Sequence, residues 1–361
     1  EESTDPQPVP EGGEAAEEPK ASADGHLEVK PERWVHRVPE KYRDRAPRSV
    51  TLPDGGDGLL VEGQPLLEQN FLDLRAGRAY GDWGPVGMRV EDAAGTGSPE
   101  QRLAEQDVDG MAAEVLYPNM VAGPVLWRNI VHDEPYKAMV RAYNDWHIDE
   151  WCGAHPGRFI PLALPVMWDA ELAAEEVRRV AKKGCYALSF TENPDKIGFP
   201  SIHDSHWDPL WKACSDEGVI VCIHIGSASG MSFTTMDSPV DVMIATSPVS
   251  IVSCAADLLW SQILRRYPTL KFALSEGGIG WIPYFLERAD YVHEHHHKWT
   301  HQDFGGKRPS DLFREHIVTC FIDDRIGVRL RHDVGIDTIT WECDYPHSDS
   351  TWPRAPERLI D

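Results

Sequence analysis

The sequence has few of the features that would place the protein in a membrane or on a nucleic acid. The apolar runs visible in the sequence, such as residues 219–225, are far shorter than the roughly 20 residues needed to cross a bilayer. The net charge is −24, with 35 Lys and Arg against 59 Asp and Glu, so nucleic acid and anionic membrane surfaces would be repelled. Neither is expected as a partner.

Cysteine is scarce and forms no recognisable pattern. The seven Cys residues include no Cys-x-x-Cys pair of the kind found in thiolate zinc sites, and their odd number does not suit a disulfide framework. The first residues are acidic, whereas a secretory leader is basic and then apolar. Reduced thiols and a cytoplasmic location are therefore expected.

Residues 1–20 differ in composition from the rest of the chain. They contain seven acidic residues and one Lys, and they nearly lack bulky apolar side chains. Such a segment cannot bury enough apolar surface to fold, so a disordered acidic tail is predicted for 1–20. Residues 21–361 are long enough to bury the core of one large domain.

From about Ala21 onward, short apolar runs alternate with amphipathic helical stretches. A strand–helix repeat sustained over roughly 300 residues indicates parallel strands joined by crossover helices. The expected helices lie at 135–155, 170–183, 208–217, 253–266, 281–297 and 326–334. The expected strands lie at 21–27, within 108–117, and at 159–166, 184–190, 219–224, 270–275, 316–322 and 336–341.

Eight such strand units favour an α/β fold of the (β/α)₈ (TIM) barrel type. The alternative, a doubly wound sheet that binds a dinucleotide, is weakened because no Gly-x-Gly-x-x-Gly follows an early strand. The sequence leaves room for only a few helical turns after the last expected strand. Residues 38–98 are rich in Gly, Pro and Asp without a clear period, and they are interpreted as a cap inserted over one mouth of the barrel.

Polar residues at the ends of the expected strands predict a metal site, because barrel active sites gather at the carboxyl ends of the strands. Asp24 and His26 alternate along the first strand and therefore point to the same side. His224 ends the fifth strand, and Asp344 follows the eighth. Two imidazoles and two carboxylates would hold one divalent cation, with Zn²⁺ or Mn²⁺ expected first and Fe²⁺ as a further option.

Each of these residues also has an ordinary structural interpretation when taken alone. Asp24 fits a cap or turn before Gly25, and Asp344 fits a turn before Tyr-Pro. His26 fits a loop histidine and His224 a core histidine. Together with Glu276 after the sixth strand, however, polar residues occupy four strand ends of one barrel, which favours a shared site.

The run from His293 to His297 looks like a metal cluster but lies at the far end of an expected helix, so a solvated surface face is the favoured interpretation. Candidates for a substrate pocket share a position in expected strand-to-helix loops or at helix starts. Packing is an equal alternative for each Trp among them. These candidates are Trp127, Arg128, Trp168 and Trp281.

At the strand ends the sequence resembles the amidohydrolase superfamily, and within it the branch that includes aminocarboxymuconate-semialdehyde decarboxylase. The resemblance extends from Ala21 to Pro353 and is most specific in segments 275–283, 287–290 and 343–347. It implies a metal-dependent barrel enzyme with a small-molecule substrate. A homodimer or a higher homo-oligomer is implied as well.

Individual positions also match the family pattern. Asp24-Gly25-His26 takes the place of the His-x-His metal pair on the first strand. His224 matches the metal histidine of the fifth strand, and Asp344 matches the aspartate of the eighth. Asp24 replaces a histidine, so the site is more anionic and Mn²⁺ or another hard ion becomes more plausible.

The branch contains mainly non-oxidative decarboxylases, together with hydrolases and a hydratase. Decarboxylases of this branch usually carry a histidine where this chain has Glu276. An ionised Glu is a poor proton donor but a good general base toward a metal-bound water. The first prediction is therefore a metal-dependent hydrolase of a small carboxylated or cyclic substrate. In it Glu276 is the base, Asp344 acts at the metal and His347 contacts the substrate.

Two alternatives remain open at the level of the sequence. One is a non-oxidative decarboxylase of an aromatic or muconate-like acid, in which a substrate carboxylate or hydroxyl binds the ion. The other is a barrel that has lost its chemistry and serves only to bind a partner, which the changes at Asp24 and Glu276 keep in consideration.

Overall fold

The computed structural model describes residues 20–62, 67–68, 74–79, 88–118, 134–228, 235 and 237–360, with backbone alone at 67–68 and 358–360. The predicted acidic tail therefore lies outside the described residues, apart from Lys20. The predicted cap, residues 38–98, falls partly within them.

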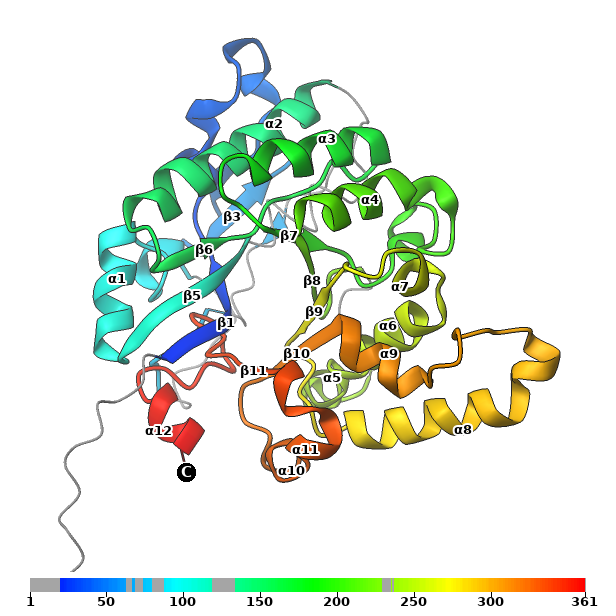
Figure 1. Ribbon diagram of the computed structural model, residues 1–361. Coiled ribbons are helices and arrows are strands. Elements are labelled where there is room, and N and C mark those ends of the chain that lie inside the picture. Colours follow the sequence, from blue (N-terminus) through cyan, green and yellow to red (C-terminus); the bar gives the residue numbers. More distant parts are fainter. Residues whose placement is uncertain are drawn as a thin grey trace, which may run out of the picture.

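Eight parallel strands lie in chain order around a closed ring (Figure 1). The two sheets that they form are joined at both seams, by a bridge between Ala163 and Leu188 and by another between Gly25 and Tyr345. The predicted (β/α)₈ barrel is thereby confirmed. The strands are β1 (Lys20–Leu27), β5 (Met111–Pro118), β6 (Phe159–Pro161), β7 (Ala187–Phe190), β8 (Ile220–His224), β9 (Phe272–Ser275), β10 (Ile317–Phe321) and β11 (Ile339–Trp341).

The barrel strands are apolar on both faces, as expected for parallel strands covered by helices. In β8, Val221, Cys222 and Ile223 are all buried, and the run ends at the half-buried His224. The polar residue thus appears where the strand leaves the core. This arrangement places functional side chains at the carboxyl ends of the strands.

The longer helices form an outer layer around the strands (Figure 1). α3 shows how the sequence specifies one of them. The Asp169 carboxylate caps its first turn by accepting from the backbone N–H groups of Glu171 and Leu172. Ala173, Val177 and other small apolar residues then recur on one buried face.

The helices have the following bounds: α1 (Pro99–Val108), α2 (Glu134–Trp146), α3 (Ala170–Ala181), α4 (Asp208–Glu217), α5 (Val240–Thr246), α6 (Val249–Trp260), α7 (Ile263–Arg266), α8 (Ile282–Thr300), α9 (Pro309–His316), α10 (Arg325–Arg329), α11 (Arg331–Val334) and α12 (Ala355–Ile360). The expected helix at 208–217 coincides with α4. The expected helix at 253–266 is instead two helices, because Ser261 adopts an extended conformation and its hydroxyl accepts from the Ile263 N–H.

One apolar helical stretch is longer than the apolar runs considered in the sequence. Helical residues Val240–Trp260 are long and apolar enough to cross a membrane by length and composition. In the structure the stretch is divided into α5 and α6 at Ser247 and Pro248, and α6 buries Ile251, Leu258 and other apolar side chains in the barrel core. The expectation that membranes are not partners therefore remains a prediction.

The region interpreted as a cap contains a small antiparallel sheet of β2 (Arg48–Thr51), β3 (Asp57–Leu60) and β4 (Leu67–Glu68). Further along, the Ala76 N–H donates to the carbonyl of Pro346 at 3.2 Å. This part of the insertion thus lies against the loop that follows β11. Its role as a cap stays a prediction.

Candidate metal centre

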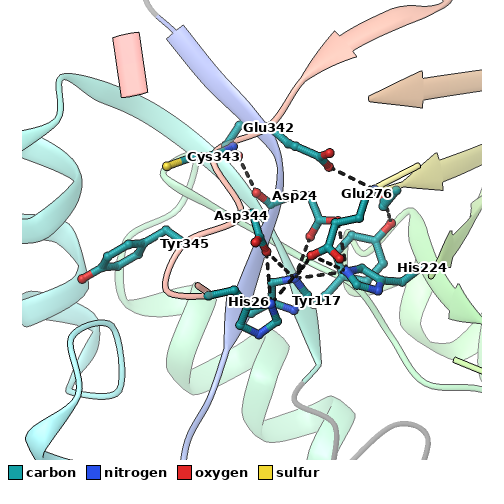
Figure 2. A network of polar contacts seen from close by, with 12 residues as sticks. Asp24, His26, Tyr117, His224, Glu276, Glu342, Cys343, Asp344 and Tyr345 are labelled. Carbon is teal, nitrogen blue, oxygen red and sulfur yellow. Dashed lines mark hydrogen bonds and ion pairs between the residues drawn. The ribbon is translucent and has the colours of Figure 1, made fainter. Parts of the chain in front are cut away.

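The four strand ends identified in the sequence converge on one cluster of side chains (Figure 2). His26 Nε2 lies 3.1 Å from Asp344 Oδ1, 3.2 Å from Glu276 Oε1 and 3.4 Å from Asp24 Oδ1. His224 Nε2 lies 3.0 Å from Glu276 Oε1, 3.5 Å from Asp24 Oδ2 and 3.2 Å from His26 Nε2. The four predicted ligands and Glu276 thus form two overlapping groups, one with Asp24 and His224 and one with Asp344, which share His26 and Glu276.

Backbone pairing between β1 and the segment after β11 aligns three of these residues. The His26 N–H donates to the Tyr345 carbonyl at 2.8 Å, and the Asp344 N–H donates to the Asp24 carbonyl at 3.2 Å. The Ser22 hydroxyl donates to the same Asp24 carbonyl and accepts from the Cys343 N–H at 2.8 Å. The first and last strands therefore hold their carboxylates and imidazole at a defined separation.

The turns that carry Glu276 and Asp344 are conformationally strained. Both residues have positive φ, 58° and 53°, in the left-handed region that non-glycine residues rarely adopt. Each such residue costs about 1 kcal/mol or more, and strain of this kind clusters at functional sites. The next residue, Gly277, leaves no room for a Cβ, which would lie 2.2 Å from Ile251 Cγ2.

The two aspartates are buried, and Asp24 lacks the hydrogen-bond donors that a buried carboxylate needs. Asp24 is 0% exposed and Asp344 1% exposed. Both Asp24 oxygens have no hydrogen-bond partner among the described residues, whereas Asp344 Oδ1 lies 3.1 Å from His26 Nε2 and from His347 Nδ1. Burial, reinforced by neighbouring carboxylates, raises the pKa of each aspartate well above its usual value. Uncompensated burial of an anion costs several kcal/mol, and a bound cation removes that cost.

The histidine nitrogens are arranged to accept a metal ion. His224 Nδ1 lies 2.8 Å from the Ile225 carbonyl, so Nδ1 donates there and the Nε2 lone pair points into the cluster. Burial and the nearby His347 lower the pKa of His26 to about 3, which keeps that ring neutral. At His224 burial opposes protonation, but Glu276 and Asp24 outweigh it and raise the pKa well above its usual value, so an ion bound there would take the place of a proton. Neutral imidazoles are the form that binds metals.

The distances within the cluster also fit a coordination sphere. Ligand atoms about 2.1 Å from one ion lie about 3.0–3.4 Å from each other in octahedral or tetrahedral geometry. The separations of 3.0–3.5 Å around His26 and His224 match that range. The mixed carboxylate and imidazole donors suit Mn²⁺ or Zn²⁺.

His347 lies at the edge of the cluster. Its ring stacks on His26 with centroids 3.6 Å apart, and Nδ1 lies 3.1 Å from Asp344 Oδ1 and 3.7 Å from Glu276 Oε1. Burial opposes protonation, but Asp344 and Glu276 outweigh it and raise the pKa of His347 well above its usual value. The pKa of His224 is raised in the same way, so His347 is the imidazole outside the four predicted ligands that can carry a proton.

Two further residues belong to the site and were not identified from the sequence. Glu342 is 0% exposed, accepts from the Cys320 thiol, and has its pKa raised to about 8 by burial and by Glu276. The Tyr117 hydroxyl bonds Ser275 Oγ at 2.7 Å, and its ring lies 5.3 Å from that of His224. Each of these residues lies at or next to a strand end, which is the signal that could have revealed them.

The predicted substrate-contacting residues are not gathered at the cluster to the same extent. Trp127 and Arg128 lie outside the described residues. Trp168 is half-buried in the turn before α3 and packs against the core. The Trp281 indole N–H donates to the carbonyls of Gly277 and Gly278, so it braces the turn after Glu276. Their contact with substrate stays a prediction.

The histidine run lies on α8, where its side chains are exposed or half-buried. The rings of His293 and His297 have centroids 5.0 Å apart. The groups of three or more metal-ligating side chains found among the described residues belong to the barrel centre and do not include this run.

Comparison with known proteins identifies the family. Residues 77–361 match the sequence family described as Amidohydrolase. The chain belongs to the amidohydrolase family. Within this family, the gamma-resorcylate decarboxylase of Polaromonas sp. (strain JS666 / ATCC BAA-500) is 24% identical over 302 residues, which cover 80% of this chain and 87% of that protein.

Solved structures share the barrel. A 5-carboxyvanillate decarboxylase from Sphingomonas paucimobilis has a TM-score of 0.65 at 19% identity, covering 95% of this chain and 92% of the other. A dihydroxybenzoic acid decarboxylase from Polaromonas sp. JS666, with bound manganese and the inhibitor 2-nitroresorcinol, has a TM-score of 0.59 at 17% identity, covering 95% and 90%. At these identities the likeness shows a common fold.

Proposed function

We propose that this amidohydrolase-family chain binds one divalent cation, Mn²⁺ or Zn²⁺, and catalyses the non-oxidative decarboxylation of a hydroxylated aromatic acid. The observation that carries the proposal is the position of His347, whose Nδ1 lies 3.1 Å from Asp344 Oδ1 and 3.7 Å from Glu276 Oε1 and whose pKa these carboxylates raise. The names of the relatives support the reaction class, because the curated relative and both solved structures described above are decarboxylases of aromatic acids.

Asp24, His26, His224 and Asp344 would hold the ion, with Glu276 close enough to share in its coordination. The buried acids of this site would repel a carboxylate substrate. The ion, when bound, supplies the positive charge that attracts the carboxylate and a neighbouring hydroxyl of the substrate. The side chains around the ion would then hold the aromatic ring of the substrate in one orientation.

Decarboxylation breaks the bond between the ring carbon and the carboxylate, and the electron pair stays on that carbon until a proton arrives. His347 supplies this proton and is reprotonated from solvent, so the acid is converted to CO₂ and the decarboxylated ring. Its Nδ1 faces Asp344, whereas Nε2 lies 4.0 Å from Glu28 Oε1, beyond hydrogen-bond distance. Nε2 is thus the nitrogen left to deliver the proton.

The position of Glu276 gives little support to the role of general base that the sequence suggested for it. Its Oε1 lies inside the cluster, 3.0–3.2 Å from the Nε2 atoms of both His224 and His26. A general base at this point would occupy the space of the metal-bound water that it has to deprotonate. Those contacts, with His224 foremost, outweigh burial and keep the pKa of Glu276 well below its usual value. The hydrolase prediction therefore has less support than its decarboxylase alternative.

The test uses the metal-loaded protein, purified without a His-tag, with gamma-resorcylate and 5-carboxyvanillate as probes. Release of CO₂ and, in D₂O, one deuterium at the vacated ring carbon are expected. His347→Gln should lower kcat by about 100-fold or more while metal content stays unchanged, since it removes a general acid. His293→Gln on α8 is the matched control and should leave kcat unchanged.

The hydrolase alternative has its own readout in the same experiments. Turnover of ester or amide analogues of these acids, with ¹⁸O from water appearing in the product and no CO₂ released, would replace the decarboxylase proposal. Normal decarboxylation by His347→Gln would remove the assigned proton donor.

A further inference from the structure

A cavity lies beside the metal centre, between the segment that follows β7 and helix α6. Its volume is about 550 Å³, within the range of small-molecule sites. None of the described residues that line it is among those of the metal cluster. Its main polar and aromatic wall consists of Glu192, Asn193, Lys196, Ser250, Asp257 and Trp260.

Glu192 is the distinctive group in this wall. It is 4% exposed, and its Oε2 has a single long contact, 3.5 Å, with the Ala228 N–H. Its Oε1 has no hydrogen-bond partner among the described residues. Burial, only partly opposed by the Ser250 hydroxyl, raises the pKa of Glu192 above its usual value. A buried carboxylate with an open oxygen is costly unless a donor reaches it.

The other charged groups of the wall are exposed or already paired. Asp257 Oδ1 lies 2.6 Å from His203 Nε2, and Lys196 is exposed, although its charge still helps to lower the pKa of Glu192. The Ser250 hydroxyl donates to the Ser247 carbonyl. Inside the cavity, Glu192 Oε1 is therefore the anionic acceptor without a hydrogen-bond donor. None of the described lining residues is a buried cation, so the cavity favours a positively charged ligand over an anion.

The remaining wall is apolar and includes an aromatic ring. Cys254 is buried, Ala228 is buried, and the half-buried Trp260 closes one side. A hydrated inorganic cation prefers several oxygen ligands, whereas an alkylammonium needs one strong acceptor and an apolar surface for its carbon atoms. The composition of this cavity suits the second kind of ligand.

We propose that this cavity binds a small organic amine, whose ammonium group donates to Glu192 Oε1 while its apolar body packs against Trp260 and Cys254. The site is separate from the metal centre but adjacent to it. The Ser227 hydroxyl accepts from the Glu192 N–H at 3.0 Å and donates to the carbonyl of His224 at 2.8 Å. The proposal does not depend on the reaction catalysed at the metal.

The test measures benzylamine binding to the metal-loaded protein by isothermal titration calorimetry, with benzyl alcohol as the neutral analogue. Wild type should bind benzylamine at least about tenfold more tightly than benzyl alcohol, because the charged hydrogen bond contributes most of the affinity. Glu192→Gln should weaken benzylamine binding by about tenfold or more. Asp195→Asn removes an exposed carboxylate outside the wall and should change nothing.

Two further variants keep the result interpretable. Ser253→Phe fills the cavity from α6 and leaves Glu192 in place, so it should also abolish binding even if Glu192→Gln folds poorly. Asp344→Asn should keep binding, which separates this site from the metal centre. Equal affinity of wild type and Ser253→Phe, or loss in Asp344→Asn, would overturn the proposal. Displacement by MgCl₂ beyond that caused by NaCl of equal ionic strength would show an inorganic cation site instead.

Discussion

Two fully buried carboxylates in this barrel have opposite surroundings. Glu176 on α3 is 0% exposed, and both of its oxygens are bonded: Oε1 accepts from Asn144 at 2.8 Å and from Arg179 at 2.7 Å, and Oε2 accepts from Arg179 at 2.8 Å and from Arg141 at 3.3 Å. Asp24 on β1 is equally buried, yet neither of its oxygens has a hydrogen-bond partner among the described residues.

This is the difference expected between a structural acid and the metal ligand proposed for Asp24. The guanidinium and amide groups around Glu176 neutralise and saturate it, so that cluster is complete within the protein. Asp24 faces His224, His26 and other acids, and its neighbours leave its charge unbalanced. A cation is the missing partner, and the strained turns at Glu276 and Asp344 hold further donors toward the same point.

Removing a ligand should have the largest effect. Asp344→Asn preserves the shape of the side chain but removes an anionic donor, so metal content should fall from about one equivalent to well below one. Decarboxylation should fall by about 1,000-fold or more, since the ion contributes several kcal/mol to catalysis. Elemental mass spectrometry and CO₂ release measure the two effects. A variant that keeps its full metal content would contradict the ligand assignment.

Removing the structural acid should affect stability and leave the metal in place. Glu176→Ala leaves Arg179 and Asn144 without their shared acceptor. Breaking a buried pair of this kind lowers the free energy of unfolding by about 3–5 kcal/mol. Urea denaturation measures the loss. The exposed neighbour Glu175, whose Oε2 lies 3.9 Å from Arg141, supplies the matched control, and Glu175→Ala should cost less than about 1 kcal/mol. Similar losses of unfolding free energy in the Glu176 and Glu175 variants would show that Glu176 is not a structural acid of the kind contrasted here with Asp24.

Adding the ion should stabilise only a chain with an intact centre. At a Mn²⁺ concentration of 100 times Kd, wild type gains about 2.7 kcal/mol, because the native state alone binds the ion. Asp24→Asn should show a much smaller gain in thermal unfolding experiments. An equal gain in both proteins would place the stabilising ion elsewhere, for example at His293 and His297.

Helix ends and strand-end residues that depend on their neighbours in the chain could be predicted from the sequence. The helix Asp208–Glu217 begins at an Asp-Pro and ends at Gly218 in the left-handed conformation, so both of its ends are specified locally. Asp24 and His26 follow the period of a strand, and His224 ends an apolar run. Such positions depend on neighbours in the chain.

The features that could not be predicted depend on contacts between distant segments. Glu342 meets Cys320 and the backbone of Glu276 only because β9, β10 and β11 lie side by side. Glu276 was interpreted as a base because it stands where decarboxylases of this branch usually carry a histidine. Its closeness to His224 and His26 has no signature in the sequence. Its left-handed φ, which turns the side chain into the cluster, is equally a product of the folded strand end.

Two buried histidines, one in the metal cluster and one outside it, differ in the same way, and both have a lowered pKa. Burial lowers the pKa of His147 to about 4, as it lowers that of His26 to about 3. His147 is not part of the metal cluster, and its Nδ1 lies 3.2 Å from the Leu162 carbonyl. It is a structural histidine that remains neutral in the native state at neutral pH.

The pH dependence of stability should report on His147. In the unfolded chain a histidine takes up a proton below pH about 6.5, whereas native His147 does so only near its lower pKa. Its contribution is therefore complete above the unfolded value and is lost as the pH falls toward 4, by about 1.4 kcal/mol per pH unit. His147→Gln should lose about 1.4 kcal/mol less than wild type between pH 7.5 and 5.5. His332→Gln, on the exposed face of α11, should behave like wild type, and equal losses in all three proteins would exclude His147 as a source of acid sensitivity.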